Sequence, residues 1–173
     1  MTATAEFIPL SLCVLTVSDT RGPDNDTSGD YLVTALNEAG HRLAERALLP
    51  DDRYRLRAQV SQWIADPAID GVIVTGGTGF TGRDSTPEAL LPLLDKTMPG
   101  FGEIFRQLSY AEIGTSTMQS RAFAGLANAT FVFCLPGSTG ACRTAWEKLI
   151  RAQLDARTKP CNLVNLRPRL REQ

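Results

Sequence analysis

Residues 76–79, Gly-Gly-Thr-Gly, lie in the segment of this chain best suited to chemistry. Glycines have no Cβ atom, so the backbone can turn tightly here and its N–H groups can approach a ligand closely. Just beyond the turn, Thr86 and Pro87 predict the N-cap and the first residue of a helix. Backbone amides beside the positive end of a helix are typical of an anion-binding site. The segment therefore predicts a site for a phosphate-like group.

A carboxylate, Asp84, lies two residues before the predicted helix cap. Next to a phosphate site a carboxylate is repulsive unless a cation lies between the two, so this combination indicates a Mg²⁺-bound nucleotide or phosphate ester. In the alternative interpretation, Asp84, Ser85 and Thr86 are only turn and cap residues, which is the commoner role of such residues. The segment alone does not decide between the two.

Two cofactor motifs come close to this segment, and each lacks an essential part. Residues 77–82 fit the dinucleotide pattern G-x-G-x-x-G, yet the acidic residue expected about 20 positions further on would fall in a predicted loop, 98–103. A P-loop would need lysine and a hydroxyl residue where Arg83 and Asp84 stand. A nicotinamide-dependent enzyme is thus a remote alternative, and a P-loop is not supported.

Alternating strands and helices must position these residues. Strands are predicted at 10–18, 42–49, 72–74 and 129–136, and helices near 27–39, 56–64, 87–94, 104–108 and 142–150. The run Val72–Val74 has no polar alternation, which is typical of a strand covered on both faces of a parallel sheet. The pattern therefore indicates an α/β fold with a mostly parallel sheet.

Three predicted strands end in segments that suit ligand binding. Ser18 and Asp19 follow the first strand, the glycine turn follows the third, and Pro-Gly-Ser at 136–138 follows the last. Ligands of open α/β sheets bind at the carboxyl ends of the strands, so we expect these segments to converge on one site. The polar connection 115–121 would suit either a rim of that site or a solvated loop.

Asp51 follows the second predicted strand and has two possible roles. Its position before a helix favours an N-cap, whereas its position at a strand end could also bring it to the edge where Asp84 lies. Thr27 or Ser28 is expected to cap the first helix.

Length and composition set broad limits on the function. The 173 residues, 43% of them hydrophobic and 21% charged, predict one domain, and a net charge of −1 argues against nucleic acid and anionic membranes as partners. No apolar segment approaches the ~20 residues that span a bilayer and no secretory signal is recognised, so a cytoplasmic protein is expected. The cysteines lack C-x-x-C spacing and are expected to be reduced packing residues, and the single histidine, His41, cannot form a zinc site with them.

Four segments occur together in an order that resembles a known family: 16–20, 75–89, 99–103 and 135–137. The chain is similar to the molybdenum cofactor biosynthesis protein B (MoaB) and molybdopterin adenylyltransferase (Mog) family over residues 10–165. That resemblance implies a three-layer α/β/α fold of the MogA type. It also implies a tail at 1–9, a single molybdopterin-binding domain at 10–165 and a basic tail at 166–173.

The resemblance also implies an activity and its site. Enzymes of this family bind molybdopterin and use Mg²⁺ and ATP to transfer AMP to its terminal phosphate, with release of pyrophosphate. Asp51 and Asp84 match the catalytic acidic positions and are candidate Mg²⁺ ligands. Candidate substrate- and nucleotide-binding residues, from the resemblance and the strand ends together, are Ser18, Asp19, Gly76, Gly77, Thr78, Gly79, Ser120, Pro136, Gly137 and Ser138.

One departure from the Mog branch keeps a second interpretation open. That branch usually has proline two residues after the Pro-Gly pair, where this chain has Thr139. The alternative is therefore a non-catalytic pterin-binding or scaffolding protein of the same pathway. In either case the resemblance implies a homotrimer or homohexamer, with other molybdenum cofactor biosynthesis proteins as further partners.

Overall fold

A central six-stranded sheet positions everything else in the computed structural model, which describes residues 6–172. Its strands lie in the order β2-β1-β3-β6-β5-β4. Their bounds are β1 Ser11–Val17, β2 Arg42–Leu49, β3 Gly71–Thr75, β4 Lys96–Thr97, β5 Phe123–Ala127 and β6 Thr130–Leu135. The first four strands in that order are parallel to one another, whereas β5 is antiparallel to β6 and β4 to β5. The mostly parallel sheet is confirmed, with an antiparallel edge that the sequence did not predict.

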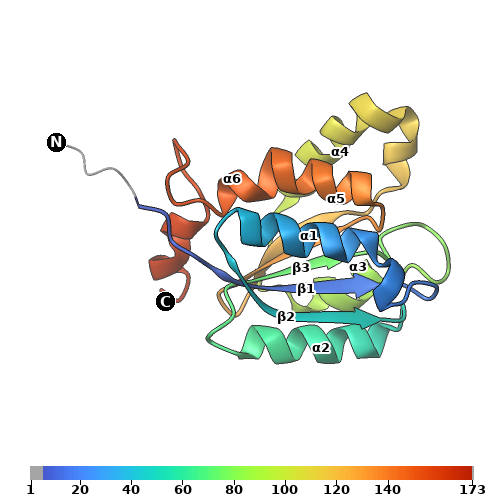
Figure 1. Cartoon of the computed structure of the whole chain (residues 1–173), viewed down its shortest axis with the longest axis horizontal. Coiled ribbons are helices and arrows are strands. Elements are labelled where there is room, and N and C mark those ends of the chain that lie inside the picture. The colour runs from blue at the N-terminus through green and yellow to red at the C-terminus, as the bar shows by residue number, and fades with distance from the viewer. Residues whose placement is uncertain (1–5, 173) are drawn as a thin grey trace.

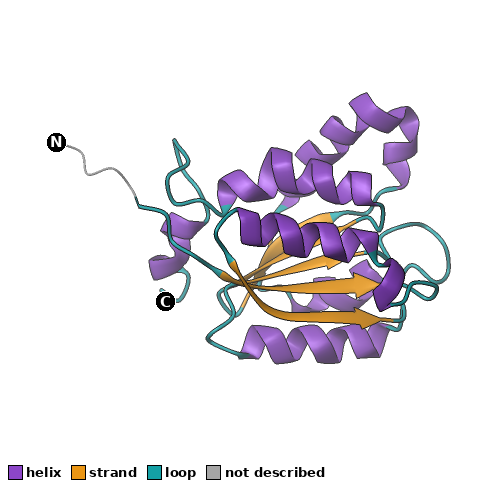
Figure 2. Cartoon of the chain, viewed as in Figure 1, coloured by secondary structure: helices purple, strands orange, loops and turns teal. Residues whose placement is uncertain are grey.

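Helices cover both faces of the sheet, which gives three layers (Figures 1 and 2). The α-helices are α1 Thr27–Glu38, α2 Arg53–Ala65, α3 Thr86–Leu90, α4 Pro99–Ile113, α5 Thr139–Ala145 and α6 Arg151–Gln153. Short 3₁₀ segments lie at Pro23–Asn25, Leu91–Leu93, Gly114–Gln119 and Val164–Arg169, and a π-helical turn at Trp146–Ile150 joins α5 to α6. Helices α1, α4 and α5 pack on one face of the sheet, and α2 and α3 on the other.

The core explains why the central strands lack polar alternation. Along β3, Ile73 packs into the cluster on the α1 side, while its neighbours Val72 and Val74 pack into the cluster on the α2 side. All five residues of β3 are buried. A strand whose alternate side chains both meet helices needs apolar residues at every position.

Two helix caps differ from the sequence prediction by one residue. Helix α1 is capped by Asp26, whose carboxylate accepts a hydrogen bond from the amide three residues on, and Thr27 and Ser28 lie inside the helix. Helix α2 is capped by Asp52 and not by Asp51, because the Asp52 carboxylate accepts hydrogen bonds from the amides two and three residues on. The prediction that Asp51 serves mainly as an N-cap is therefore wrong.

The segment 98–103 was predicted as a loop and is instead the start of α4. Pro99 occupies the first helical position, where its missing N–H costs nothing. Phe101 and Phe105 then stack within the core at a centroid separation of 6.2 Å. The C-terminal half of α4 projects beyond the body of the molecule in Figure 1, on the side toward which the arrowheads of β1 and β2 point.

Three of the four cysteines have the packing role expected of them, and Cys161 does not. Cys13, Cys134 and Cys142 are buried free thiols, and Cys161 is exposed. His41 is buried and its Nδ1 accepts a hydrogen bond from the Leu10 amide, 3.2 Å away. Burial lowers the pKa of His41. Within residues 6–172, no helix combines the length and the apolar character needed to cross a bilayer.

Candidate functional site

The turn after β3 needs glycine for steric reasons. Gly76 and Gly77 have φ angles of +104° and +67°, in the left-handed region that favours glycine. A Cβ atom on Gly76 would lie 2.1 Å from the carbonyl oxygen of Val17, and one on Gly77 would lie 2.6 Å from Asp51 Oδ2. The turn therefore packs directly against the end of β1 and against Asp51.

Hydrogen bonds hold the carbonyl groups of this turn and leave amides available. Thr86 donates through its hydroxyl to the Gly76 carbonyl at 2.8 Å and through its amide to the Gly77 carbonyl at 3.0 Å. The Thr78 carbonyl accepts from the Arg121 amide at 3.0 Å. Among residues 6–172, no acceptor is found for the amides of Gly77 and Thr78. The turn thus presents N–H groups that an anion could accept.

The predicted cap of α3 is corrected by one residue. Ser85 occupies the N-cap position, and Thr86 is the first residue of a helix only five residues long. A helix of little more than one turn has a small dipole, because few peptide units add up. The anion-binding character of this segment therefore comes from the amides of the turn rather than from α3.

Arg121 clamps the loop that follows the turn. Its Nε donates to the Gly79 carbonyl at 2.8 Å, one terminal nitrogen donates to the Asp84 carbonyl at 2.9 Å, and the other pairs with Glu88. The sequence left residues 115–121 open as either a rim of the site or a solvated loop. Ser116, Gln119 and Ser120 of this segment line the cavity, whereas Arg121 fixes both ends of the segment 79–84.

Asp84 lies at the cavity edge of this loop. Its Oδ2 accepts hydrogen bonds from the amide and the hydroxyl of Thr81, at 2.8 and 2.6 Å. Burial raises the pKa of Asp84, but the hydrogen bonds from Thr81 and from the Gly79 amide outweigh it, and the pKa lies below its ordinary value. Asp84 is therefore ionised at neutral pH.

Asp51 lies behind the turn, on its other side. Its carboxylate accepts hydrogen bonds from the Ser85 hydroxyl and, at 3.1 Å, from the Ser85 amide, and the residue is 8% exposed. Burial is the largest influence and raises the pKa of Asp51. The hydrogen bonds from Ser85 lower it, and the negative charges of Asp19 and Asp84 raise it further. The mutual influence of Asp51 and Asp84 places both acids in one electrostatic neighbourhood.

Asp19 connects the end of β1 to both acidic positions. It accepts a hydrogen bond from the Asp51 amide at 3.0 Å and forms two with the Arg83 guanidinium, at 2.9 and 2.7 Å. The bonds from Arg83 lower the pKa of Asp19. Asp19 therefore ties the glycine loop to β1 and to the start of the α2 segment.

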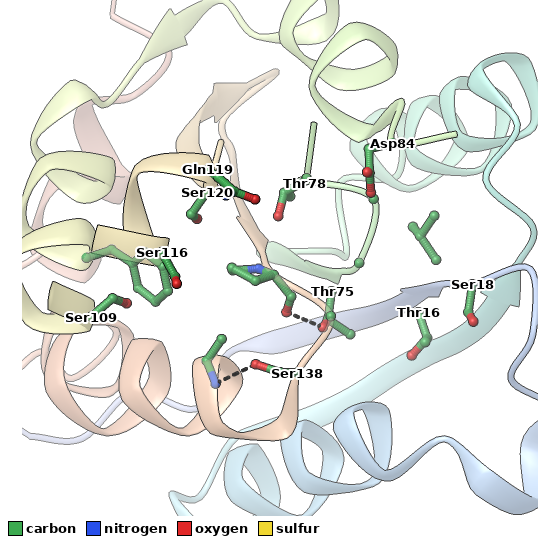
Figure 3. Close-up of a pocket in the computed structure, with 18 of the residues that line it drawn as sticks. Thr16, Ser18, Thr75, Thr78, Asp84, Ser109, Ser116, Gln119, Ser120 and Ser138 are labelled. Atoms are coloured by element: carbon green, nitrogen blue, oxygen red, sulfur yellow. Dashed lines mark hydrogen bonds between the residues drawn. The ribbon is translucent and has the colours of Figure 1, made fainter. Parts of the chain in front are cut away.

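A cavity of about 570 Å³ opens in front of the turn, at the carboxyl ends of β1, β3 and β6. It is lined by Thr16, Val17, Ser18, Arg21, Thr75, Gly76, Gly77, Thr78, Gly79, Asp84, Phe105, Ser109, Ile113, Ser116, Gln119, Ser120, Pro136, Gly137, Ser138 and Ala141. In Figure 3, Thr16, Ser18 and Asp84 lie on one side, and Ser109 and Ser116 on the other.

The two sides of the cavity differ in chemistry. The side formed by the strand ends offers turn amides, hydroxyls and the Asp84 carboxylate. The side formed by α4 and the 3₁₀ segment after it combines the apolar Phe105 and Ile113 with the polar Ser109 and Gln119. An apolar wall with a few convergent polar groups suits a flat heterocycle, and the turn suits its anionic tail.

Comparison with known families identifies the family of this chain. Residues 13–156 match the family model described as "Probable molybdopterin binding domain". The chain belongs to this family. The resemblance to MoaB and Mog proteins inferred from the sequence motifs is thereby confirmed.

Members of this molybdopterin-binding family are similar to this chain over most of its length. The molybdenum cofactor biosynthesis protein B of Escherichia coli K12 is 59% identical over 157 residues, which cover 91% of this chain and 92% of that protein. A crystal structure of a molybdenum cofactor biosynthesis protein B has a TM-score of 0.83 at 40% identity, covering 95% of this chain and 98% of the other. A MogA structure has a TM-score of 0.72 at 25% identity, covering 78% and 89%. The three-layer α/β/α fold is thus the one that this family shares.

The structure gathers most of the candidate site residues at one cavity. Asp84 and every candidate binding residue except Asp19 line it. Asp19 and Asp51 lie outside the lining, behind the glycine turn and within hydrogen-bonding distance of each other. Which of these residues contact a ligand in this member of the molybdopterin-binding family stays a prediction.

Several lining residues were missed in the sequence. Phe105, Ser109 and Ile113 recur every four residues and so share one face of α4, which was the signal available for them. Ser109 was not predicted as a site residue because a single serine within an apolar helix face resembles an ordinary core position. Arg21 belonged to a segment that appeared to be a simple turn, and its place in the cavity depends on the fold of the 18–28 segment.

Of the two candidate Mg²⁺ ligands, only Asp84 lines the cavity, whereas both carboxylate oxygens of Asp51 accept hydrogen bonds from Ser85. Among residues 6–172, no group of three or more His, Cys, Asp or Glu side chains is arranged to hold a metal ion. Mg²⁺ typically keeps several waters and binds through one or two carboxylates plus substrate phosphates. Asp84, at the cavity edge next to the free turn amides, meets that requirement, and Asp51 adds negative charge from behind.

We expect Asp51→Asn to stabilise the fold in a pH-dependent way. Because burial raises the pKa of Asp51 above its ordinary value of 3.8, the ionised carboxylate destabilises the folded chain, and this penalty grows as pH rises through the folded-state pKa. The neutral variant escapes the penalty. Urea denaturation should show a larger gain in the free energy of unfolding at about pH 8 than at about pH 4. An equal difference at both pH values would contradict this assignment.

Proposed function

We propose that this protein acts in molybdenum cofactor biosynthesis by transferring AMP from Mg-ATP to the terminal phosphate of molybdopterin. The observation that carries the proposal is the arrangement at the glycine turn. The ionised carboxylate of Asp84 borders the same cavity as the unpaired amides of Gly77 and Thr78, and Asp51 lies directly behind them. A carboxylate next to anion donors repels a phosphate unless a cation lies between them, so this arrangement suits a phosphate that carries Mg²⁺.

The role in molybdenum cofactor biosynthesis is the broader part of this conclusion. It rests on membership in the molybdopterin-binding family and on a relative of that name at 59% identity over nearly its full length. Adenylyl transfer is the narrower part and rests on the site geometry.

The reaction places modest demands on the protein. An oxygen of the pterin phosphate forms a bond to the α-phosphorus of ATP, the bond from that phosphorus to the bridging oxygen breaks, and pyrophosphate leaves with the electron pair. No side-chain nucleophile is needed, so the protein acts by positioning and charge stabilisation. Mg²⁺ would neutralise developing negative charge on the phosphates. Amides of Gly77 and Thr78 would donate to phosphate oxygens, and the wall with Phe105 and Ile113 would hold the pterin.

A direct assay tests the proposed activity. Purified protein supplied with Mg-ATP and molybdopterin should release pyrophosphate in proportion to the adenylylated pterin formed. Omitting either substrate or chelating Mg²⁺ should stop the release, because each contributes an essential charge or reactant. If pyrophosphate stays at background while molybdopterin is bound, adenylyl transfer is wrong for this protein.

A second candidate is a non-catalytic pterin-binding or scaffolding protein of the same pathway. Thr139, in place of the Mog-branch proline, is the feature that favours it. In the structure the Thr139 hydroxyl lies 3.0 Å from that of Thr27 and 3.2 Å from that of Ser28, and Thr139 does not line the cavity. The substitution therefore leaves the lining intact, which favours the enzyme. Calorimetry that showed molybdopterin binding without any consumption of ATP would favour the scaffold.

Self-association is proposed for either candidate. Large apolar side chains are exposed on α4 and on the 3₁₀ segment that follows it, with Ile104 48% exposed and Met118 77%. Their burial between subunits would support a homotrimer or homohexamer.

A further inference from the structure

Arg21 differs in charge from every other residue that lines the cavity. Among the lining residues it is the only cationic side chain, and Asp84 is the only anionic one. The two come from different segments, Arg21 from the loop after β1 and Asp84 from the glycine loop. The cavity lining therefore carries one charge of each sign, on two different segments of the chain.

The turn that carries Arg21 is fixed by a serine. The Ser18 hydroxyl accepts hydrogen bonds from the amides of Thr20 and Arg21, at 3.2 and 3.0 Å. Asp19, within the same turn, is directed to Arg83 and the Asp51 amide. The Asp19 side chain of this turn thus bonds Arg83 and the Asp51 amide, whereas Arg21 lines the cavity.

The Arg21 guanidinium is held mainly by a serine hydroxyl, and its ion pair with Asp26 is long, at 3.9 Å. One terminal nitrogen donates to the Ser28 hydroxyl at 2.8 Å, and that hydroxyl donates to the Gly137 carbonyl at 2.8 Å. This chain of bonds anchors Arg21 between the turns that follow β1 and β6. Within the described chain, no other side-chain hydrogen bond from Arg21 is found, so donors of its fork remain for a ligand.

The carboxylate of Asp26 is bonded more closely by another arginine than by Arg21. Asp26 is fully buried and accepts bonds from Arg46 at 2.8 Å and from the Thr16 hydroxyl at 2.7 Å, whereas Arg21 is 3.9 Å away. Arg46 also pairs with Asp30, whose side chain is 58% exposed. Asp26 is therefore shared by two arginines, and Arg21 meets it only at 3.9 Å, without a hydrogen bond.

We propose that Arg21 binds the terminal phosphomonoester of the pterin substrate and so holds the attacking phosphate. This inference rests on the proposed adenylyl transfer. In that reaction the nucleotide phosphates carry Mg²⁺ and are assigned to the Asp84 carboxylate, whereas the monoester has no metal of its own. A guanidinium fork matches the geometry of phosphate oxygens and needs no other cation. Arg21 is thus a specificity residue for the acceptor and not for ATP.

The variant Arg21→Gln separates the two substrates. Equilibrium binding of molybdopterin without ATP should weaken ~10- to 100-fold, as expected for loss of a charge-assisted contact, and KM for molybdopterin should rise in parallel. KM for Mg-ATP should stay within about twofold, since the proposal assigns the metal-bearing nucleotide phosphates to Asp84 and not to Arg21. Arg21→Lys should recover part of the affinity, because it restores charge but not the fork.

The matched control is Arg143→Gln. Arg143 lies on α5, stacks over the Tyr31 ring and does not line the cavity, so its loss should change neither constant. Unchanged molybdopterin binding by Arg21→Gln, or an equal loss for both substrates, would overturn the inference. If the wild type binds molybdopterin and never releases pyrophosphate, the proposed activity fails, while the comparison of molybdopterin affinities still decides the role of Arg21.

Discussion

Asp84→Asn should reduce pyrophosphate release on the order of 10³-fold while the protein still folds and still binds molybdopterin. The variant removes the only negative charge on the cavity lining, and with it several kcal/mol of support for a metal-bound phosphate. The amide oxygen of asparagine can still accept the hydrogen bonds that Thr81 donates to Asp84 Oδ2. Initial rates of pyrophosphate release at saturating substrates, together with calorimetric binding of molybdopterin, measure the two effects separately.

A neighbouring acid provides the control for Asp84→Asn. Asp52 is an exposed carboxylate that caps α2 and does not line the cavity, and asparagine caps helices about as well as aspartate. Asp52→Asn should therefore turn over at the wild-type rate. If both variants lost activity equally, the effect would come from general charge at this edge. If Asp84→Asn lost turnover and binding together, a defect in the loop would explain both.

The strands that could be predicted from sequence are β2 and the three buried strands β1, β3 and β6. β1, β3 and β6 are runs of apolar residues, β3 and β6 lead into glycine turns, and both signals are local. β5 reads Phe-Ala-Gly-Leu-Ala, with no β-branched residue, and β4 is only two residues long. Their strand character comes from pairing with β6 and with each other, which a local pattern does not contain.

The neighbouring residues Asp51 and Asp52 show a limit of prediction from local sequence patterns. Asp51 and Asp52 are equally good cap residues by type, and only the backbone conformation decides that Asp52 caps α2. Asp51 is then free to accept hydrogen bonds from Ser85, 34 positions away along the chain. Contacts at that separation depend on the parallel order of β2, β1 and β3.

The candidate site was predictable in position but not in detail. The rule that ligands bind at the carboxyl ends of parallel strands correctly brought the turns after β1, β3 and β6 together. It says nothing about the opposite wall, which α4 supplies through Phe105 and Ser109. It also does not reveal that Arg21, from a turn, is the basic residue of the cavity.

Gly76→Ala should lower the free energy of unfolding by about 3 to 5 kcal/mol. Two penalties add. Alanine is strained at a φ of +104°, and its Cβ would lie 2.1 Å from the Val17 carbonyl oxygen, a backbone atom that cannot rotate away. Relief would require β1 and β3 to separate at the point where Thr75 pairs with Thr16. Urea denaturation followed by circular dichroism measures the loss, and turnover should fall with it because the same turn carries the amides.

Gly82→Ala tests whether the loss of stability is specific to Gly76 or follows the replacement of any glycine in the loop. Gly82 has no heavy atom within 4 Å of a built Cβ and no positive φ, so alanine fits there. Because alanine also restricts the unfolded chain, this variant should be unchanged or stabilised by up to about 1 kcal/mol. A comparable loss in both variants would mean that the loop tolerates no side chain anywhere. The contact between Gly76 and the end of β1, which places the turn amides in front of the cavity, would then not be the reason for glycine.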